Sequence, residues 1–326
     1  MGGTSMHSIY QEQLNFSEQY HYFCVKNCAY QLLINRGWKE KEIHQTLNLD
    51  FQLRIAVKNM QFLVEQKNVV EPFSDEKICI KRKGETFSNS LIQCLDMLNR
   101  GNAIIAIVDT FFLPYRIEYQ RNHAKHSVII AGISNDNIYL IDWYPPHYFK
   151  GAISLAEWKK AWESENPLDN NPFSGTPIHN EWFTIDFKLC EVEKDNLCKQ
   201  NWYSMLESNA TCKSINLLQK ILKYNVVALE KEKLRLFHDA LFLHYRSSIQ
   251  ALHFLQSFEL GEAFQMDVHL ILNDMIKILG DINSLFLMAS IKKKEERILK
   301  ICNHLEQYKV KRIELSNIIK SMDYTL

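Results

Sequence analysis

The chain has 326 residues, of which 46% are hydrophobic and 23% are charged, and its 38 lysine and arginine residues balance 38 acidic residues. This is the composition of a globular protein, long enough for one large domain or two smaller ones. The balanced charge argues against nucleic acid or an anionic membrane as the main partner.

The sequence shows neither the pattern of a membrane-spanning helix nor that of a signal peptide. It contains no run of about 18 apolar residues, which a membrane-spanning helix needs, and no basic start followed by an apolar run, which marks a signal peptide. We therefore expect a cytoplasmic protein whose eight cysteines are reduced.

The first 190 residues predict an α+β domain. A helix is expected at 24–36. Short apolar runs bounded by turn residues predict strands at 103–109, 126–133, 137–143 and 182–187. The tripeptide Ser-Asn-Asp between the second and third strands supplies turn residues for a hairpin. Because the helix precedes the strands and does not alternate with them, an antiparallel sheet is favoured over a parallel one.

From residue 191 onward the pattern changes to that of a helical domain. Leu, Ile, Lys and Glu recur at helical spacing, and no proline occurs in this part. We expect four helices, at about 194–224, 228–256, 260–289 and 291–322. The predicted domains are therefore 1–190 and 191–326.

Two cysteines, Cys24 and Cys28, lie four residues apart where the first helix is expected to begin. Backbone N–H groups are unpaired at a helix N-terminus and the helix dipole is positive there, so a nucleophilic thiolate at Cys24 would be stabilised. Cys28 lies one turn further along the same side. Two other interpretations remain open: both cysteines are buried core thiols, or they bind zinc together with His123 and His126.

His126 opens one strand of the predicted hairpin, and Asp142 lies near the end of the next strand. In a hairpin centred on 134–136 the two side chains fall roughly opposite each other. A carboxylate that bonds one imidazole nitrogen orients the other nitrogen toward a thiol. A structural histidine is the alternative interpretation, and His123 and His21 are alternative bases.

Several separated blocks of the sequence resemble the N-terminal domain of the butirosin biosynthesis protein H family. One block is Cys24 with the Ala-Tyr-Gln-Leu-Leu helix that leads to Gly37. The others are VDTFFLPY at 108–115 and HAKHSVIIAGISNDNIYLID at 123–142. The resemblance covers about residues 17–190, and it implies a papain-like cysteine-peptidase fold.

The resemblance also implies roles for individual residues. It makes Cys24 the nucleophile, His126 the base and Asp142 the orienting residue, and it suggests Gln19 as an oxyanion-hole side chain. The sequence departs from the family pattern in two places. Tyr-Phe directly precedes Cys24 where the family has histidine, and Trp-Tyr-Pro-Pro follows Asp142 where the family has an immediate proline.

The function implied by the resemblance is acyl transfer in natural-product (antibiotic) biosynthesis. A thioester on the phosphopantetheine of an acyl or peptidyl carrier protein would pass its acyl group through Cys24 to a small amine, with no bound cofactor and no metal. Asp109 is expected either to cap a turn or to face the cleft and place the amine, and Tyr115 and Tyr119 to line the same opening. Two alternatives are a peptidase or thioesterase with the same triad and a non-catalytic binding module.

Overall fold

The computed structural model describes most of the chain. The described residues are 22–58, 61–64, 72–73, 78–144, 147–169, 173–185, 189, 191–224, 231–289 and 294–321. Within these ranges the protein is a mixed α+β structure with a six-stranded antiparallel sheet and a helical C-terminal part, as predicted.

The chain divides into two compact units. Unit 1 combines Met1–Ile43 with Val70–Cys190, and unit 2 combines His44–Val69 with Glu191–Leu326. The division near residue 190 agrees with the expected boundary. Residues 44–69, which we placed in the first domain, belong instead to the helical unit.

The sheet of unit 1 has the strand order β3-β8-β4-β5-β6-β7, and all its neighbouring strands are antiparallel. The strands are β3 (Cys79–Arg82), β4 (Ile104–Asp109), β5 (Lys125–Ile133), β6 (Asn137–Tyr144), β7 (His147–Ser154) and β8 (Trp182–Ile185). Four of them lie where apolar runs predicted strands. The two strands at the edges, β3 and β7, were not predicted, because their exposed positions break the apolar pattern.

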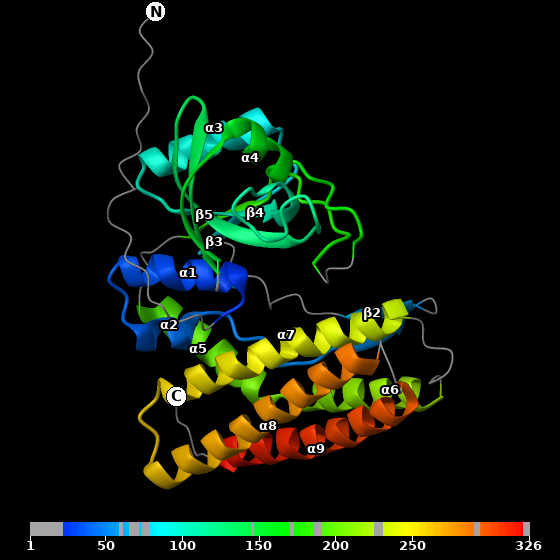
Figure 1. Ribbon diagram of the computed structural model, residues 1–326. Coiled ribbons are helices and arrows are strands. Elements are labelled where there is room, and N and C mark those ends of the chain that lie inside the picture. Colours follow the sequence, from blue (N-terminus) through cyan, green and yellow to red (C-terminus); the bar gives the residue numbers. More distant parts are fainter. Residues whose placement is uncertain are drawn as a thin grey trace, which may run out of the picture. The chain divides into compact units, whose positions relative to one another are not determined.

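Four helices belong wholly or partly to unit 1: α1 (Cys24–Asn35), α2 (Glu40–Thr46), α3 (Phe87–Asn99) and α4 (Leu155–Trp162). In Figure 1, α1 lies on one side of the sheet and α3 and α4 lie on the other. α1 packs against β4, β5 and β6. Its end is set by Gly37, which adopts a left-handed φ of 84° that a side chain would disfavour.

Unit 2 contains five helices among the described residues, α5 (Glu191–Leu206), α6 (Asn209–Tyr224), α7 (Lys231–Gln256), α8 (Glu262–Ala289) and α9 (Lys294–Ser321). The single helix predicted at 194–224 is wrong, because the chain breaks between α5 and α6. Side chains of α9 bond the last carbonyl of α5 and the one just after it: Ser316 Oγ donates to Leu206 O at 2.7 Å and Arg312 Nη2 to Glu207 O at 2.6 Å. These bonds satisfy carbonyls that a continuous helix would have paired itself.

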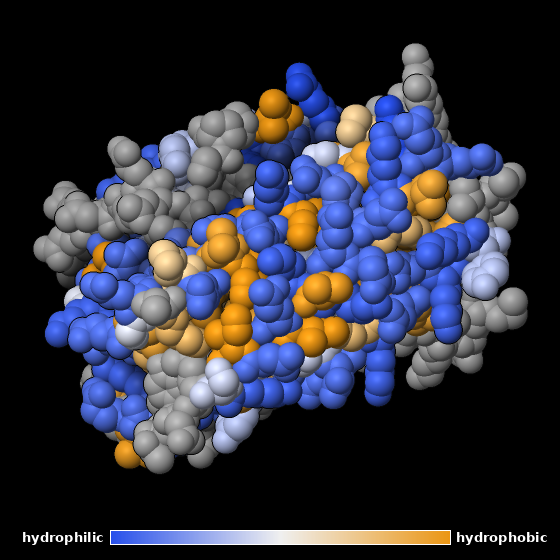
Figure 2. All heavy atoms as spheres, turned by 90° about the horizontal axis from the view of Figure 1, so that it is seen from below, coloured by the Kyte–Doolittle hydropathy of each residue, from blue (hydrophilic) through white to orange (hydrophobic). Residues whose placement is uncertain are grey.

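The surface of the helical unit mixes apolar and charged side chains. Figure 2 shows such a face from below, with apolar side chains interspersed among hydrophilic ones. Exposed apolar residues of α8 include Met266 and Leu270, and those of α9 include Leu299 and Val310. Among the described residues, no helix is long and apolar enough to cross a membrane.

An extended segment at 49–55 explains why residues 44–69 belong to unit 2. Every second backbone N–H in it donates to a side chain of α5 or α6, at distances of 2.8 to 3.0 Å. The pairs are Leu49 with Asn201 Oδ1, Phe51 with Ser204 Oγ, Leu53 with Thr211 Oγ1 and Ile55 with Ser214 Oγ. The same four apolar residues are buried in the helical core. The segment therefore runs like a strand beside helices, and a short hairpin of β1 (Ile55–Lys58) and β2 (Gln61–Val64) follows it.

The bond from Leu53 to Thr211 gives a test of this packing. Thr211→Val keeps the shape of the side chain but leaves the buried Leu53 N–H without its acceptor. We expect the free energy of unfolding to fall by about 2 kcal/mol, measured by urea unfolding followed with far-UV circular dichroism. Ser284→Ala, which removes an exposed hydroxyl bonded to its own helix, is the control and should change little. Equal stability of the two variants would contradict this account.

Candidate active site

Cys24 is the first residue of α1, as the sequence predicted. Phe23 precedes it with an extended backbone and makes no side-chain capping bond, and Phe23 O accepts the first helical bond, from Asn27 N, at 2.8 Å. Phe23 has no polar side-chain atom, so it cannot cap the N–H groups of the first turn of α1. Asn27 Nδ2 also donates to Trp143 O at 3.0 Å, which ties the start of α1 to β6 beside Asp142.

His126 and Asp142 form a buried pair on the central hairpin. His126 Nε2 lies 2.8 Å from Asp142 Oδ1, and the two residues are 6% and 0% exposed. Ile129 pairs with Ile141 in the β5–β6 ladder, so His126 is offset by two positions from the residue directly opposite Asp142. The two are therefore diagonal neighbours on one face, within reach of each other. The predicted pairing is present, with this shift in register.

The pKa of His126 reflects these contacts. Burial of the imidazole is the largest influence and lowers the pKa, but the charge and the hydrogen bond of Asp142 raise it, and so does a hydrogen bond with the Cys24 side chain. The result is a pKa of about 9. Because Nε2 bonds Asp142, Nδ1 is the ring nitrogen available to the Cys24 thiol. The structure thus brings Cys24, His126 and Asp142 together.

The buried Arg116 and the half-buried Glu118 extend this pair into a charge network that the sequence analysis missed. Arg116 Nη1 lies 3.5 Å from Asp142 Oδ2, and Arg116 Nε lies 3.1 Å from Glu118 Oε2. Burial lowers the pKa of Arg116, but Asp142 and Glu118 outweigh that effect and raise it. The available signal was Arg-Ile-Glu directly after the Leu-Pro-Tyr of the 108–115 block, where a charged pair follows an aromatic loop.

The Cys28 thiol contacts Ser127, which is not part of the triad. Its Sγ lies 3.6 Å from Ser127 Oγ and 3.7 Å from Ser127 O, and burial raises its pKa well above the usual range for a thiol. His123, the fourth residue of the zinc interpretation, bonds Asp109 instead. Within the described ranges, no group of three or more His, Cys, Asp or Glu side chains is placed to hold a metal ion.

Asp109 is fully buried and caps a turn, which was one of its two expected roles; it does not face a cleft. Its Oδ1 accepts from Phe111 N at 3.1 Å and Ala124 N at 3.2 Å. Its Oδ2 lies 2.7 Å from His123 Nδ1 and accepts from Ser164 Oγ at 2.6 Å. The carboxylate therefore joins the end of β4 to the segment before β5 and to the residues that follow α4.

The remaining candidate residues from the sequence analysis are Tyr115, Tyr119, Gln19 and His21. Tyr115 stacks on Phe149 of β7, the residue that pairs with Asp142, with ring centroids 3.8 Å apart. Burial, and then the charge of Asp142, raises the pKa of the Tyr115 hydroxyl. Tyr119 is half-buried. Gln19 and His21 lie outside the described residues.

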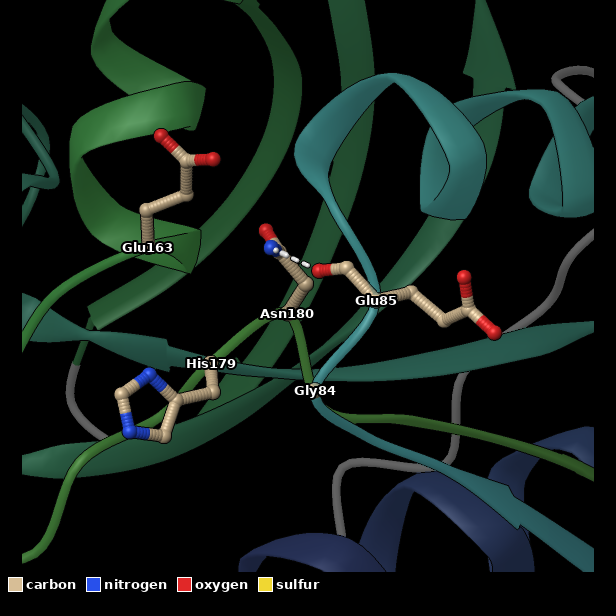
Figure 3. Close-up of a pocket in the computed structure, with 5 residues that line it drawn as sticks. All are labelled: Gly84, Glu85, Glu163, His179 and Asn180. Carbon is tan, nitrogen blue, oxygen red and sulfur yellow. Dashed lines mark hydrogen bonds between the residues drawn. The ribbon is translucent and has the colours of Figure 1, made fainter.

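A polar cavity of about 570 Å³ lies elsewhere in unit 1, and Figure 3 shows its lining. Gly84, Glu85, Glu163, His179 and Asn180 line it, and Asn180 Nδ2 donates to Glu85 O at 2.8 Å. No residue of the Cys24 triad is among these, so the cavity is distinct from the candidate active site.

The chain matches no protein-family model and no curated protein.

The raised pKa of His126 can be measured by an NMR titration. We expect a midpoint near pH 9 in the native chain. In Asp142→Asn it should fall below the ordinary value of 6.5, because burial remains and the carboxylate is gone. Since the folded chain binds this proton more tightly than the unfolded chain, its contribution to stability is complete below pH 6.5 and is lost as the pH rises through 9. A midpoint that Asp142→Asn leaves unchanged would refute the assignment.

Arg116 should influence the same titration in the opposite direction. Its positive charge lowers the pKa of His126. We expect the midpoint of His126 to rise in Arg116→Gln, and to stay unchanged in Arg100→Gln, which alters an arginine paired with Asp96 on the surface. A fall in Arg116→Gln would show that the guanidinium acts on His126 mainly by placing Asp142.

Proposed function

We propose that the protein is a cysteine-dependent acyltransferase that forms an amide from a carrier-bound thioester and an amine. The observation that carries the proposal is the meeting of Cys24, at the N-terminus of α1, with the buried His126–Asp142 pair. The helix before an antiparallel sheet is consistent with a papain-like fold, which is part of the proposal. The resemblance to the butirosin biosynthesis protein H family supplies the substrate class, in natural-product biosynthesis.

The first step forms the acyl-enzyme. The raised pKa of His126 keeps a proton on its imidazole near neutral pH, and Asp142 stabilises this imidazolium. In the reactive pair, the proton that Cys24 has given up is the one held on His126. The Cys24 sulfur attacks the thioester carbonyl, and backbone N–H groups of the first turn of α1 stabilise the oxyanion. The carbon–sulfur bond to pantetheine then breaks, and His126 returns the proton to the departing thiol.

The second step transfers the acyl group. A primary amine attacks the acyl-Cys24 carbonyl, His126 accepts a proton from the nitrogen, and the bond to the Cys24 sulfur breaks. The nearly buried position of Cys24, 8% exposed, limits the access of water to this intermediate. Hydrolysis by a peptidase or thioesterase would use the same residues, and it differs only in the acceptor.

The nucleophile can be identified by intact mass spectrometry. The protein is incubated with a panel of short acyl N-acetylcysteamine thioesters, with and without 1,3-diaminopropane. We expect an acyl adduct and amide product in the native chain, loss of both in Cys24→Ala, and a fall in acylation rate of roughly 100-fold or more in His126→Gln.

Cys28→Ala is the matched control, because it removes the thiol one turn away and should leave acylation intact. Acylation that persists in Cys24→Ala would refute the proposal. Acylation followed only by release of free acid, with no amide, would establish hydrolysis in its place. An unreactive Cys24 would favour a binding module.

A further inference from the structure

A second histidine–aspartate pair, His123 with Asp109, lies three residues before His126 in the chain. His123 Nδ1 is 2.7 Å from Asp109 Oδ2, and Asp109 is fully buried. Two backbone N–H groups and the hydroxyl of Ser164 also bond this carboxylate, so its position is set from several elements. The mechanism described above does not use this pair.

The imidazole of His123 is held in one orientation. The ring of Phe111 stacks on it with centroids 4.1 Å apart and planes 9° apart, and the ring of Phe112 contacts it edge-on. The backbone N–H of His123 donates to Asp169 Oδ2 at 2.8 Å. Asp109 and Asp169 are the charged side chains that these contacts place against His123. With Nδ1 engaged by Asp109, Nε2 is the other ring nitrogen of a side chain that is 18% exposed.

Chain connections and packing link His123 to the Cys24 triad indirectly. Three residues of extended chain span at most about 11 Å, which bounds the distance between the Cα atoms of His123 and His126. The segment that carries Asp169 continues to Phe173, whose carbonyl accepts from Lys125 N at 2.8 Å. The ring of Phe173 packs against Phe23, the residue before Cys24, with centroids 5.2 Å apart.

Amide formation from an ammonium ion has one more proton to remove than hydrolysis, and a second base at the site would remove it. An aliphatic amine is an ammonium ion at neutral pH and carries three protons on nitrogen, whereas the amide nitrogen retains one. The second proton lost accompanies the attack and passes through His126 to the Cys24 sulfur. The first proton must leave before the nitrogen has a lone pair with which to attack. Hydrolysis has no such requirement, since water already has its lone pairs.

We propose that His123, held by Asp109, binds the acceptor ammonium and takes this first proton at Nε2. The proton then passes to solvent, the free amine attacks the acyl-Cys24 carbonyl, and the electron pair of the broken carbon–sulfur bond goes to the Cys24 sulfur. The balance is acyl-Cys24 plus ammonium giving amide, Cys24 thiol and one proton. This inference rests on the proposed acyltransferase function, and it gives that function a site for a primary amine.

The test separates acylation from aminolysis in His123→Gln. With the same thioesters, acylation of Cys24 and hydrolysis of the acyl-enzyme are expected within about twofold of the native rates. Transfer to 1,3-diaminopropane should fall by roughly 100-fold at neutral pH. The deficit should shrink as the pH rises, because the free amine increases about tenfold per pH unit below its own pKa. His179→Gln, at a half-exposed histidine, is the control and should match the native chain.

The outcomes of this experiment distinguish a base from a structural residue at His123. A pH-independent loss of both acylation and aminolysis would show that His123 is only structural, and native aminolysis would overturn its role as the base. A native chain that forms acyl-Cys24 but no amide would overturn this inference and leave the nucleophile intact. A native chain that forms no acyl-Cys24 would overturn the proposed function, and with it this role of His123.

Discussion

The buried bond between His126 and Asp142 is the interaction on which the candidate site depends. A carboxylate with no exposed surface is costly to bury unless positive groups and hydrogen bonds surround it. Here its two oxygens are divided between the His126 imidazole and the Arg116 guanidinium, and Arg116 is in turn paired with Glu118. The alternation of negative and positive groups keeps each charge compensated. Within this network, Asp142 also holds a proton on His126 at a pH where an ordinary imidazole has lost it.

This network fastens the loop between β4 and β5 to the sheet of unit 1. Arg116 belongs to this loop, and it bonds Asp142, which lies on β6. Asp109 fastens the same loop at its other side, through His123. Two histidines three residues apart are thereby each held by a buried carboxylate. We regard the loop as the element that would place two bases around one acyl group.

Much of the site was predictable because its determinants are local. Cys24 could be placed at a helix start from the apolar spacing that follows it, and the turn residues at 134–136 brought His126 and Asp142 onto one hairpin. The bonds of Arg116 and Ser164 were not predictable from the same reasoning. They join segments without periodic pattern, and Ser164 is 55 positions from its partner Asp109.

The sequence by itself determined the α+β character, four strands of the sheet, the start of α1 and the helical nature of the last third, because side-chain periodicity encodes local backbone structure. Tertiary structure alone decided which distant groups satisfy one another. The backbone N–H groups of segment 49–55 donate to side chains more than 150 residues away, and Arg312 of α9 donates to the carbonyl of the residue after α5. Buried backbone groups must find partners, but only the folded packing determines which residues provide them.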